Sequence, residues 1–178
     1  MRGSLVSALP GFQVASALYM AWCLARLAVN TPYPAMVVLT ESMVPAFHPG
    51  DVIFLWNRTE LIQIGDIPVI WFEADPLPMV HRALSIAHGE EGHQLIRTKG
   101  DNNDVDDVSL YPPGQKFVYR RQIIGLVRGY LPFVGLFTIH VGKVQWLREI
   151  ILMGLLASIM LGKGKARPAG IRAHRSEH

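Results

Sequence analysis

The segment Asp51–Phe72, DVIFLWNRTELIQIGDIPVIWF, decides the fold class. It contains two short runs of β-branched and aromatic residues, Asp51–Trp56 and Asp66–Phe72, and the polar residues Asn57–Glu60 follow the first run. Runs of this length and composition are typical of strands, and polar residues between them are typical of turns. The segment therefore predicts two consecutive β-strands.

The same pattern continues on both sides of this segment. Between Ala35 and Pro132, short apolar runs alternate with turn residues such as His48–Gly50 and Asp75–Pro78. The further runs are AMVVL (35–39), MVHRALSI (79–86), HQLIRT (93–98) and QIIGLVRGYL (122–131). Closely spaced strands of this kind predict a compact, mainly β domain, either a barrel or a sandwich.

A long apolar segment precedes the predicted β domain. A helix needs about 20 apolar residues to cross a bilayer core, and Leu5–Val29 exceeds that length, with Gln13 and Arg26 as its main polar exceptions. Arg26 lies near the end of the segment, where its long side chain can reach the headgroup region. The segment therefore predicts a transmembrane helix.

Two interpretations of this helix differ in whether the mature protein keeps it. As a signal-anchor it would place the N-terminus in the cytoplasm by the positive-inside rule, because Arg2 precedes the span and no Lys or Arg lies between Arg26 and Arg58. As a signal peptide it would be cleaved at the small residues Ala15–Ala17. The apolar run continues beyond that point, which favours the anchor.

The C-terminal part contains a shorter apolar run and a basic tail. Ile150–Gly162 is short for a membrane span and predicts a helix in or partly inserted into the membrane surface, with a core helix as the alternative. Of the net charge of +3, Lys163–His178 carries +4 and the remaining chain −1. Such a tail suits anionic lipid headgroups. Without a basic stripe interleaved with aromatic residues, no nucleic-acid partner is expected.

These segments together predict four parts of the chain. Half of the residues are hydrophobic and only 17% are charged, which is low for a soluble protein. The predicted parts are a cytosolic stub with a transmembrane signal-anchor (1–30), a lumenal β domain (31–136), a membrane-associated helix (137–162) and a disordered basic tail (163–178).

Neither a metal nor another cofactor is expected. The single cysteine, Cys23, excludes an intrachain disulfide and a cysteine-based zinc site. The acidic segment Asp101–Asp107 invites comparison with a calcium loop, but Val105, Asp106 and Pro112 stand where an EF-hand needs an oxygen ligand, a glycine and a glutamate. No HExxH motif is present, so a metal-dependent hydrolase is not favoured.

Three polar positions are candidates for nucleophilic catalysis. Ser42 follows an apolar run, and its hydroxyl would need a base nearby and donors such as its own N–H and the Thr40 hydroxyl. His81 lies in an apolar run and would serve as the base near neutral pH. A carboxylate of Asp101–Asp107 would orient the imidazole. Each alone has an ordinary explanation: a turn serine, a structural histidine and a solvated loop.

Four segments together resemble the conserved boxes of type I signal peptidases. VVLTESMVPAFHPGD (37–51) is similar to the box of the nucleophilic serine, and MVHRAL (79–84) is similar to the box of the base. A histidine in place of lysine at position 81 points to the branch of the endoplasmic reticulum and the archaea. TKGDNNDVDD (98–107) and IGLVRGYLPFVG (124–135) resemble the two remaining boxes in matching order.

The resemblance implies roles for the matching residues. Ser42 would be the nucleophile, His81 its base and Asp107 the acid that orients the base. Asp101 would be a supporting carboxylate, and the Thr40 hydroxyl would contribute to the oxyanion hole. The implied activity is serine endopeptidase cleavage of signal peptides from preproteins, after small residues at positions −1 and −3.

The resemblance also implies a fold, a substrate site and a location. The fold would be an antiparallel β domain tethered by an N-terminal transmembrane helix, and the partners would be the lipid bilayer and other subunits of a signal peptidase complex. The protein would be a single-pass type II protein of the endoplasmic reticulum membrane, or of an archaeal plasma membrane. The substrate would add beside a strand edge, formed with Met43 by Met36, Val37, Val38 and Leu39. Met43, Pro45 and Phe47 would form an apolar surface near the bilayer.

Two departures from the family pattern bear on activity. Glu41 replaces the usual glycine before the nucleophile, and Val44 replaces the usual glutamate. If position 41 needs glycine for its backbone freedom, the chain would be a catalytically impaired or noncatalytic paralogue that acts as a scaffold subunit. The triplet Asn57–Thr59 is a glycosylation sequon, for which no necessary modification is expected.

Overall fold

The computed structural model describes residues 2–73, 75–89, 92–143 and 153. Residues 20–143 form one compact unit, which contains all strands that the structure describes, and residues up to Tyr19 belong to a separate unit. The predicted apolar run Ile150–Gly162 lies outside the described residues except for Met153, and so does the basic tail Lys163–His178.

The N-terminal apolar segment forms the helix α1, Arg2–Val29. Its part Gly11–Val29 has a mean hydropathy of 1.4, is not buried, and is long and apolar enough to cross a membrane. The helix ends at Asn30, whose positive φ of 54° is a common helix-terminating conformation for asparagine. Thr31 N–H donates to the Arg26 carbonyl across this end. The helix fits a transmembrane anchor, as the sequence predicts.

Residues that follow strand β2 (Val52–Trp56) bind the last turn of α1. The Arg58 guanidinium donates to the Leu27 and Ala28 carbonyls, both at 2.6 Å, and Asn57 N–H donates to the Val29 carbonyl at 2.8 Å. The last carbonyls of a helix have no partner within the helix, and a cation there also interacts favourably with the helix dipole. The end of the apolar helix is therefore fixed directly to the β domain.

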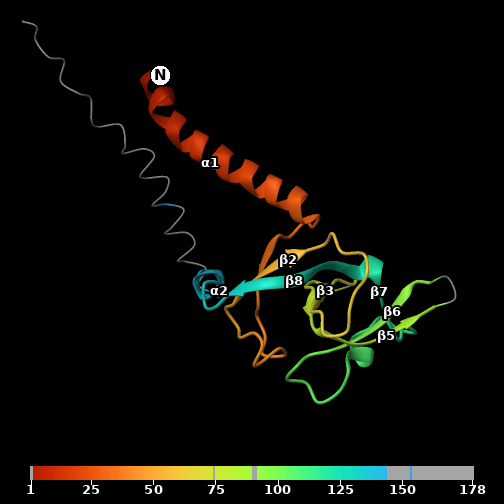
Figure 1. The fold of residues 1–178 in the computed structure, drawn as a ribbon. Helices are drawn as coiled ribbons and strands as arrows, with labels where there is room; N and C mark the ends of the chain where they lie inside the picture. The colour runs from red at the N-terminus through yellow and green to blue at the C-terminus, as the bar shows by residue number, and fades with distance from the viewer. Residues whose placement is uncertain (1, 74, 90–91, 144–152, 154–178) are drawn as a thin grey trace, which may run out of the picture. The chain divides into compact units, whose positions relative to one another are not determined.

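The larger sheet has five strands in the order β1-β2-β8-β3-β4, and all its neighbouring pairs are antiparallel. Strands β2 and β8 lie side by side at its centre (Figure 1). The other strands are β1 (Ala35–Val37), β3 (Pro68–Ile70), β4 (Met79–Val80) and β8 (Ile123–Leu131). Strands β1 and β4 are consequently the two edges of this sheet.

The smaller sheet has three antiparallel strands in the order β5-β6-β7. Two 3₁₀ helices and the helix α2 complete the described elements. Their bounds are β5 (Arg82–His88), β6 (Gln94–Lys99), η1 (Asp107–Leu110), β7 (Val118–Tyr119), η2 (Arg120–Gln122) and α2 (Leu136–Lys143). Only His81 separates β4 of the larger sheet from β5 of the smaller sheet.

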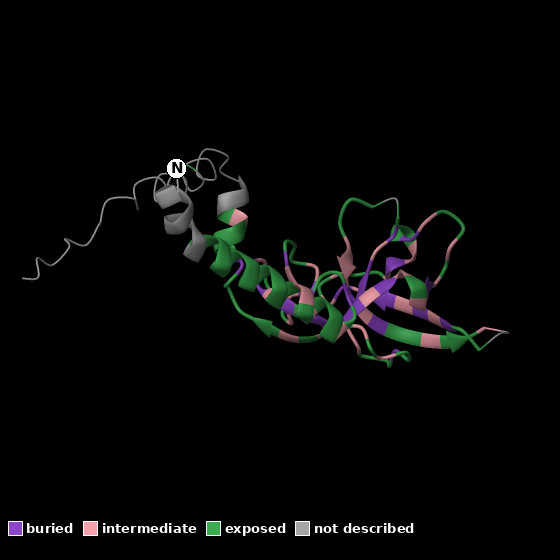
Figure 2. Cartoon of the chain, turned by 90° about the horizontal axis from the view of Figure 1, so that it is seen from above, coloured by how far each residue is buried: buried purple, intermediate pink, exposed green. Residues whose placement is uncertain are grey.

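One buried cluster joins the two sheets, and a second packs residues 38–47 against the larger sheet. Buried residues gather in the β domain, whereas residues 11–29 of α1 are mostly exposed (Figure 2). One cluster contains Ile70, Ile96 and Leu126, and the other contains Met43, Ile53 and Val69. Alternation along the strands produces this arrangement. In β6, for example, Gln94, Ile96 and Thr98 are buried while the residues between them are half-buried.

The prediction of a mainly antiparallel β domain is confirmed, with two differences in detail. The run 79–86 is two strands in different sheets rather than one, because the chain changes partner at His81. Strand β7 was not predicted, since Val118–Tyr119 is too short to show a periodic pattern.

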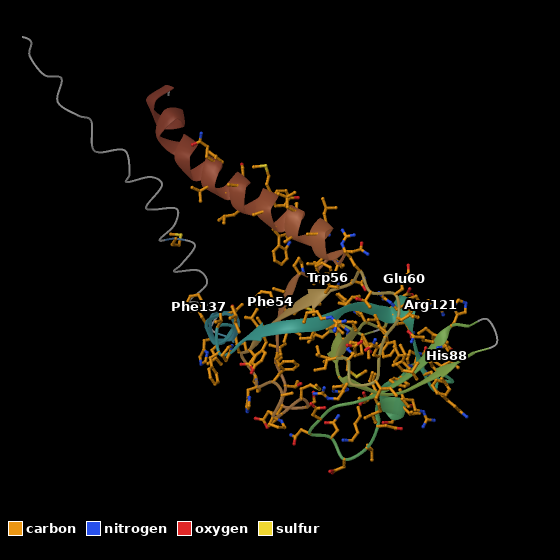
Figure 3. The ribbon with its side chains drawn as sticks, in the orientation of Figure 1. Phe54, Trp56, Glu60, His88, Arg121 and Phe137 are labelled. Carbon is orange, nitrogen blue, oxygen red and sulfur yellow. The ribbon has the colours of Figure 1, made fainter. Side chains whose placement is uncertain are left out.

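The predicted apolar surface of Met43, Pro45 and Phe47 is wrong for two of its three members. Met43 is 1% exposed and Phe47 is 5% exposed, because a helical turn from Met43 O to Phe47 N–H folds both side chains into the core. Pro45 is exposed. Phe54 and Trp56 are exposed instead, on the same side of β2 (Figure 3).

The contact between Arg58 and α1 can be tested by substitution. Arg58→Ala removes two hydrogen bonds from an exposed cation to helix carbonyls, and we expect it to lower the free energy of unfolding by about 1 kcal/mol. Amide hydrogen exchange of Thr31 and Asn57 should become faster, since both amides bind the same helix end. Lys116→Ala, at an exposed position, is the control. Unchanged exchange in Arg58→Ala would contradict the role assigned to this contact.

Candidate active site

Ser42 lies in the loop that leaves strand β1. The loop is closed at its base by hydrogen bonds from Val38 N–H to the Asp51 carbonyl and from Gly50 N–H to the Val38 carbonyl. The buried Asp51 carboxylate accepts from the N–H groups of His48, at 2.9 Å, and Phe133, at 3.0 Å. The Pro-Gly-Asp turn in the sequence thus joins the serine loop to the end of β8.

Ser42, His81 and Asp107 form a continuous chain of hydrogen bonds. The distance from Ser42 Oγ to His81 Nε2 is 3.1 Å, and the distance from His81 Nδ1 to Asp107 Oδ2 is 2.7 Å. His81 is 4% exposed and Asp107 is fully buried. With Asp107 ionised, Nδ1 carries the proton and Nε2 is free to accept from the serine hydroxyl. This is the arrangement that activates a serine by general base catalysis.

The three residues come from separate parts of the domain. His81 sits at the crossover between the sheets, where its N–H donates to the Pro68 carbonyl at 3.4 Å. Asp107 is the first residue of η1, and the Asp106 side chain caps that helix by accepting from Val108 N–H. The crossover and the 3₁₀ helix therefore place the His81 imidazole and the Asp107 carboxylate against each other.

The Thr40 hydroxyl lies 3.3 Å from Ser42 Oγ, and either group can be the donor. Thr40 and Ser42 are two residues apart on the same loop, and this contact brings their hydroxyl groups together. Thr40 is exposed at the surface of the site. Its hydroxyl is thus within reach of an atom bonded to the serine oxygen.

Asp101 does not contact the hydrogen-bonded chain in the described interactions. Its two carboxylate oxygens accept from Arg82 at 2.8 and 2.6 Å, and Arg82 also donates to the Gly65 carbonyl at 3.0 Å. The hydrogen bond to Asp101 raises the pKa of the Arg82 guanidinium above its ordinary value. Asp101 therefore holds the residue that follows His81, rather than His81 itself.

The loop at residues 100–103 holds the backbone of the serine. Asn102 N–H donates to the Ser42 carbonyl at 2.9 Å, and the Asn102 side chain donates to the Glu41 carbonyl at 3.2 Å. A Cβ on Gly100 would lie 2.7 Å from the Ser42 carbonyl oxygen. Sequence reasoning missed Asn102 and Gly100, although the Lys-Gly-Asp-Asn pattern around them was the available signal.

Glu41 fits its position without backbone strain. Among the described residues other than glycine, only Asn30 and Phe133 have a positive φ, so Glu41 has an ordinary backbone conformation. Its side chain is exposed, and its carbonyl accepts from Val44 N–H and from the Asn102 side chain. The conformation of this loop therefore does not require glycine at position 41.

A cavity of about 430 Å³ opens beside Ser42, between the two edge strands of the larger sheet. All five predicted substrate-binding residues line it. The lining residues on the β1 side include Met36, Val37, Val38, Leu39 and Met43. The opposite wall includes Leu77, Pro78, Met79 and Val80, which sequence reasoning did not assign. His81 and Ser42 also line the cavity, so both residues lie in a mostly apolar groove.

In the described part of the chain, the acidic residues near Ser42 do not gather into a metal-binding site. Within residues 2–73, 75–89, 92–143 and 153, no three His, Cys, Asp or Glu side chains are grouped so that they could hold a metal ion. Two acidic residues after Lys99 are engaged instead in the contacts described above, since Asp101 pairs with Arg82 and Asp107 with His81.

Curated relatives cover most of the chain, although no protein-family model matches it. Signal peptidase complex catalytic subunit SEC11 of Lodderomyces elongisporus is 46% identical over 147 residues, which are 82% of this chain and 87% of the relative. The protein of the same name from Eremothecium gossypii is 40% identical over 164 residues, 91% and 98% of the two chains. That of Debaryomyces hansenii is 40% identical over 153 residues, 85% and 92%.

The close approach of Gly100 to the serine loop generates a testable prediction. Gly100→Ala places a Cβ 2.7 Å from both the Ser42 carbonyl oxygen and Asn103 Nδ2, so the serine loop must shift. We expect a loss of about 1–3 kcal/mol in the free energy of unfolding and faster hydrogen exchange at Asn102 N–H. Gly129→Ala is the matched control, because nothing lies within 4 Å of its added Cβ. Equal effects of the two substitutions would contradict the steric role assigned to position 100.

Proposed function

The chain belongs to the family of signal peptidase complex catalytic subunits, and on this premise we propose that it is a serine endopeptidase that removes signal peptides from preproteins. The observation that carries the proposal is the hydrogen-bonded chain from Ser42 through His81 to Asp107. His81 is within hydrogen-bonding distance of both Ser42 and Asp107, as a base must be to take the proton of a serine and to be oriented by a carboxylate.

In the proposed reaction, Ser42 Oγ attacks the carbonyl carbon of the scissile peptide bond while His81 Nε2 takes the hydroxyl proton. His81 then gives this proton to the leaving amine, so the mature chain departs and the signal peptide remains esterified to Ser42. A water molecule, deprotonated by His81, cleaves the ester and restores the free hydroxyl. Asp107 keeps its charge throughout and stabilises the imidazolium that forms in each half-reaction.

The negative oxygen of the tetrahedral intermediate needs hydrogen-bond donors. We propose that the Ser42 N–H and the Thr40 hydroxyl supply them, because Thr40 Oγ1 lies 3.3 Å from the attacking atom. Donors aimed at a developing oxyanion are worth about 10²–10³ in rate each. The Glu41 side chain is exposed, so solvent screens its charge and we expect it to reduce this stabilisation only weakly.

The preprotein would bind as an extended segment in the groove between β1 and β4. Both the N–H and the carbonyl of Val38 face β2 through their bonds with Asp51 and Gly50. Because backbone groups alternate in direction along a strand, we expect those of Val37, the last residue of β1, to face the groove. A peptide can therefore add to this edge by main-chain hydrogen bonds. Buried side chains of Met43 and Ile53 limit the space near Ser42, which favours small residues at −1 and −3.

We propose that the protein works in the endoplasmic reticulum membrane, as a single-pass type II protein with a lumenal β domain. Helix α1 would be the anchor, since its part Gly11–Val29 can cross a bilayer. The relatives are named as subunits of a complex, so other signal peptidase complex subunits are the expected partners. Asp101 would support catalysis indirectly, through its ion pair with Arg82 beside His81.

The competing proposal is a catalytically impaired paralogue that serves as a scaffold. This proposal was suggested by Glu41, which stands where the family usually has glycine. Glu41 nevertheless occupies an ordinary backbone conformation and leaves the contacts of Ser42 intact. The geometry therefore favours the active enzyme over the scaffold. Activity itself distinguishes the two.

The decisive experiment is cleavage of a preprotein in membranes by the full chain and its variants at matched expression. Ser42→Ala, His81→Ala and Asp107→Asn should each lower kcat by about 10⁴ or more, since members of such a unit act together. The matched controls are Ser85→Ala, His88→Ala and Asp104→Asn, all at exposed positions. His88 lies at the end of β5 (Figure 3).

Each outcome of this experiment points to one conclusion. Loss in the three variants, with full activity in the controls, supports the serine endopeptidase. Processing that survives Ser42→Ala refutes it and supports the scaffold. A silent parent chain that gains activity on Glu41→Gly identifies an impaired paralogue.

The role of Thr40 can be tested separately. Thr40→Val keeps the side-chain shape but removes the hydroxyl, and we expect kcat to fall about 10²-fold with little change in KM. Thr40→Ser retains the hydroxyl and should keep most of the activity. If Thr40→Val raises KM and leaves kcat unchanged, the hydroxyl binds substrate instead of the oxyanion.

A further inference from the structure

We propose that Thr98 and Tyr111 are positioning residues that hold the Asp107 carboxylate and, through it, set the proton affinity of the catalytic base. The inference rests on the proposed function. Thr98 lies on β6 and Tyr111 directly follows η1, so neither belongs to the loops that carry Ser42 and His81.

Thr98 and His81 bind the same oxygen of Asp107. The Thr98 hydroxyl donates to Asp107 Oδ2 at 2.7 Å, the same distance as that from His81 Nδ1. Thr98 and Asp107 are both fully buried. Within the described part of the chain, Asp107 Oδ1 has no hydrogen-bond partner. The charge of this carboxylate is therefore stabilised through one oxygen, by His81 and Thr98 alone among the described side chains.

The hydrogen bonds that join Asp107, Thr98 and Tyr111 have only one consistent set of donors and acceptors. An ionised carboxylate can only accept, so the single proton of the Thr98 hydroxyl points to Asp107. The Tyr111 hydroxyl, 3.0 Å from Thr98 Oγ1, must then donate to Thr98. Tyr111 also accepts from Thr98 N–H at 3.0 Å. A directed relay thus runs from Tyr111 through Thr98 to Asp107 Oδ2.

Burial and packing hold Tyr111, the first residue of the relay, in place. It is 6% exposed, belongs to the larger buried cluster, and its ring packs edge-on against Phe72 with centroids 5.9 Å apart. Burial raises the pKa of its phenol, and the nearby charge of Asp107 adds to this, although the hydrogen bonds with Thr98 oppose it. Tyr111 therefore keeps its proton, and its role as a donor, throughout the neutral range.

The relay sets how strongly Asp107 attracts the proton on His81. While Thr98 donates to Oδ2, part of the negative charge on that oxygen is neutralised by the hydroxyl. Without this donor, Oδ2 interacts more strongly with His81, which favours the imidazolium over the neutral imidazole. The base is active only when neutral. Loss of Thr98 Oγ1 should therefore move the acidic limb of the pH profile of kcat/KM to higher pH.

Other charged groups near the site stay the same in the variants. They are paired or exposed: Arg82 pairs with Asp101, Arg97 lies 3.8 Å from Asp106, Lys99 donates to the Gly100 carbonyl, and Glu41 is at the rim. A change in the pH profile between parent and variant thus reports on the relay and not on these groups.

The test uses the full chain in membranes with its partner subunits, with kcat/KM for a preprotein measured from pH 5 to pH 9. Thr98→Val removes the hydroxyl and keeps the shape, and we expect kcat to fall roughly 10- to 100-fold, less than the ~10⁴ loss for an orienting carboxylate. The acidic limb should move to higher pH by about half a pH unit or more, because the Asp107 carboxylate then interacts more strongly with the His81 imidazolium. Thr98→Ser should restore both quantities, and Tyr111→Phe should shift the limb in the same direction by less.

A purely structural role predicts a different result. The control Tyr130→Phe is at an exposed position and should leave the profile unchanged. If Thr98→Val and Tyr111→Phe lower thermal stability or yield but leave the limb in place, the inference is overturned. If Thr98→Val does not accumulate, Tyr111→Phe, which conserves volume, decides the question alone. Processing that survives Ser42→Ala refutes the proposed function itself. If Ser42→Ala abolishes processing but Thr98→Val and Tyr111→Phe leave the acidic limb in place, only the relay is refuted.

Discussion

The short contact between His81 Nδ1 and Asp107 Oδ2 is the interaction on which the arrangement of both sheets depends. A buried carboxylate is costly unless hydrogen bonds stabilise its charge. His81 comes from the crossover between the sheets, Asp107 from η1, and Thr98 from the central strand of the smaller sheet. All three must come together for the charge on Asp107 Oδ2 to be stabilised. The contacts that join the two sheets at this point are therefore the same contacts that form the hydrogen-bonded chain.

Backbone atoms, more than side chains, fix the position of Ser42. The serine loop is held by Asn102 N–H on the Ser42 carbonyl, by the close approach of Gly100 and by the backbone hydrogen bonds of Val38 with Gly50 and Asp51 at its base. Main-chain contacts of this kind do not depend on the side chain at a neighbouring position. This is why an exposed Glu41 is accommodated, while the tight approach at Gly100 leaves no space for a Cβ.

Much of the fold was predictable from sequence, because short β-branched runs and turn residues report local preferences directly. What local patterns cannot show is a change of partner, and His81 interrupts an apolar run without any compositional signal. The burial of Met43 and Phe47 was missed for a similar reason, since one helical turn reverses the direction of both side chains. The candidate site spans separations of 39 and 26 residues, so its residue types were predictable but its contacts were not. Thr98 had one local signal, a polar residue at a core-facing strand position.

The two open edges of the larger sheet have a consequence for how the molecule behaves among copies of itself. Unpaired strand edges can recruit strands from other molecules and so promote aggregation. Here β1 has three residues and β4 has two, and Pro34 and Pro78 immediately precede them. Proline cannot donate to a ladder, and so few residues provide only a few hydrogen bonds. A flexible peptide can still lie between both edges at once, whereas a folded strand from a second copy would find too little to hold it.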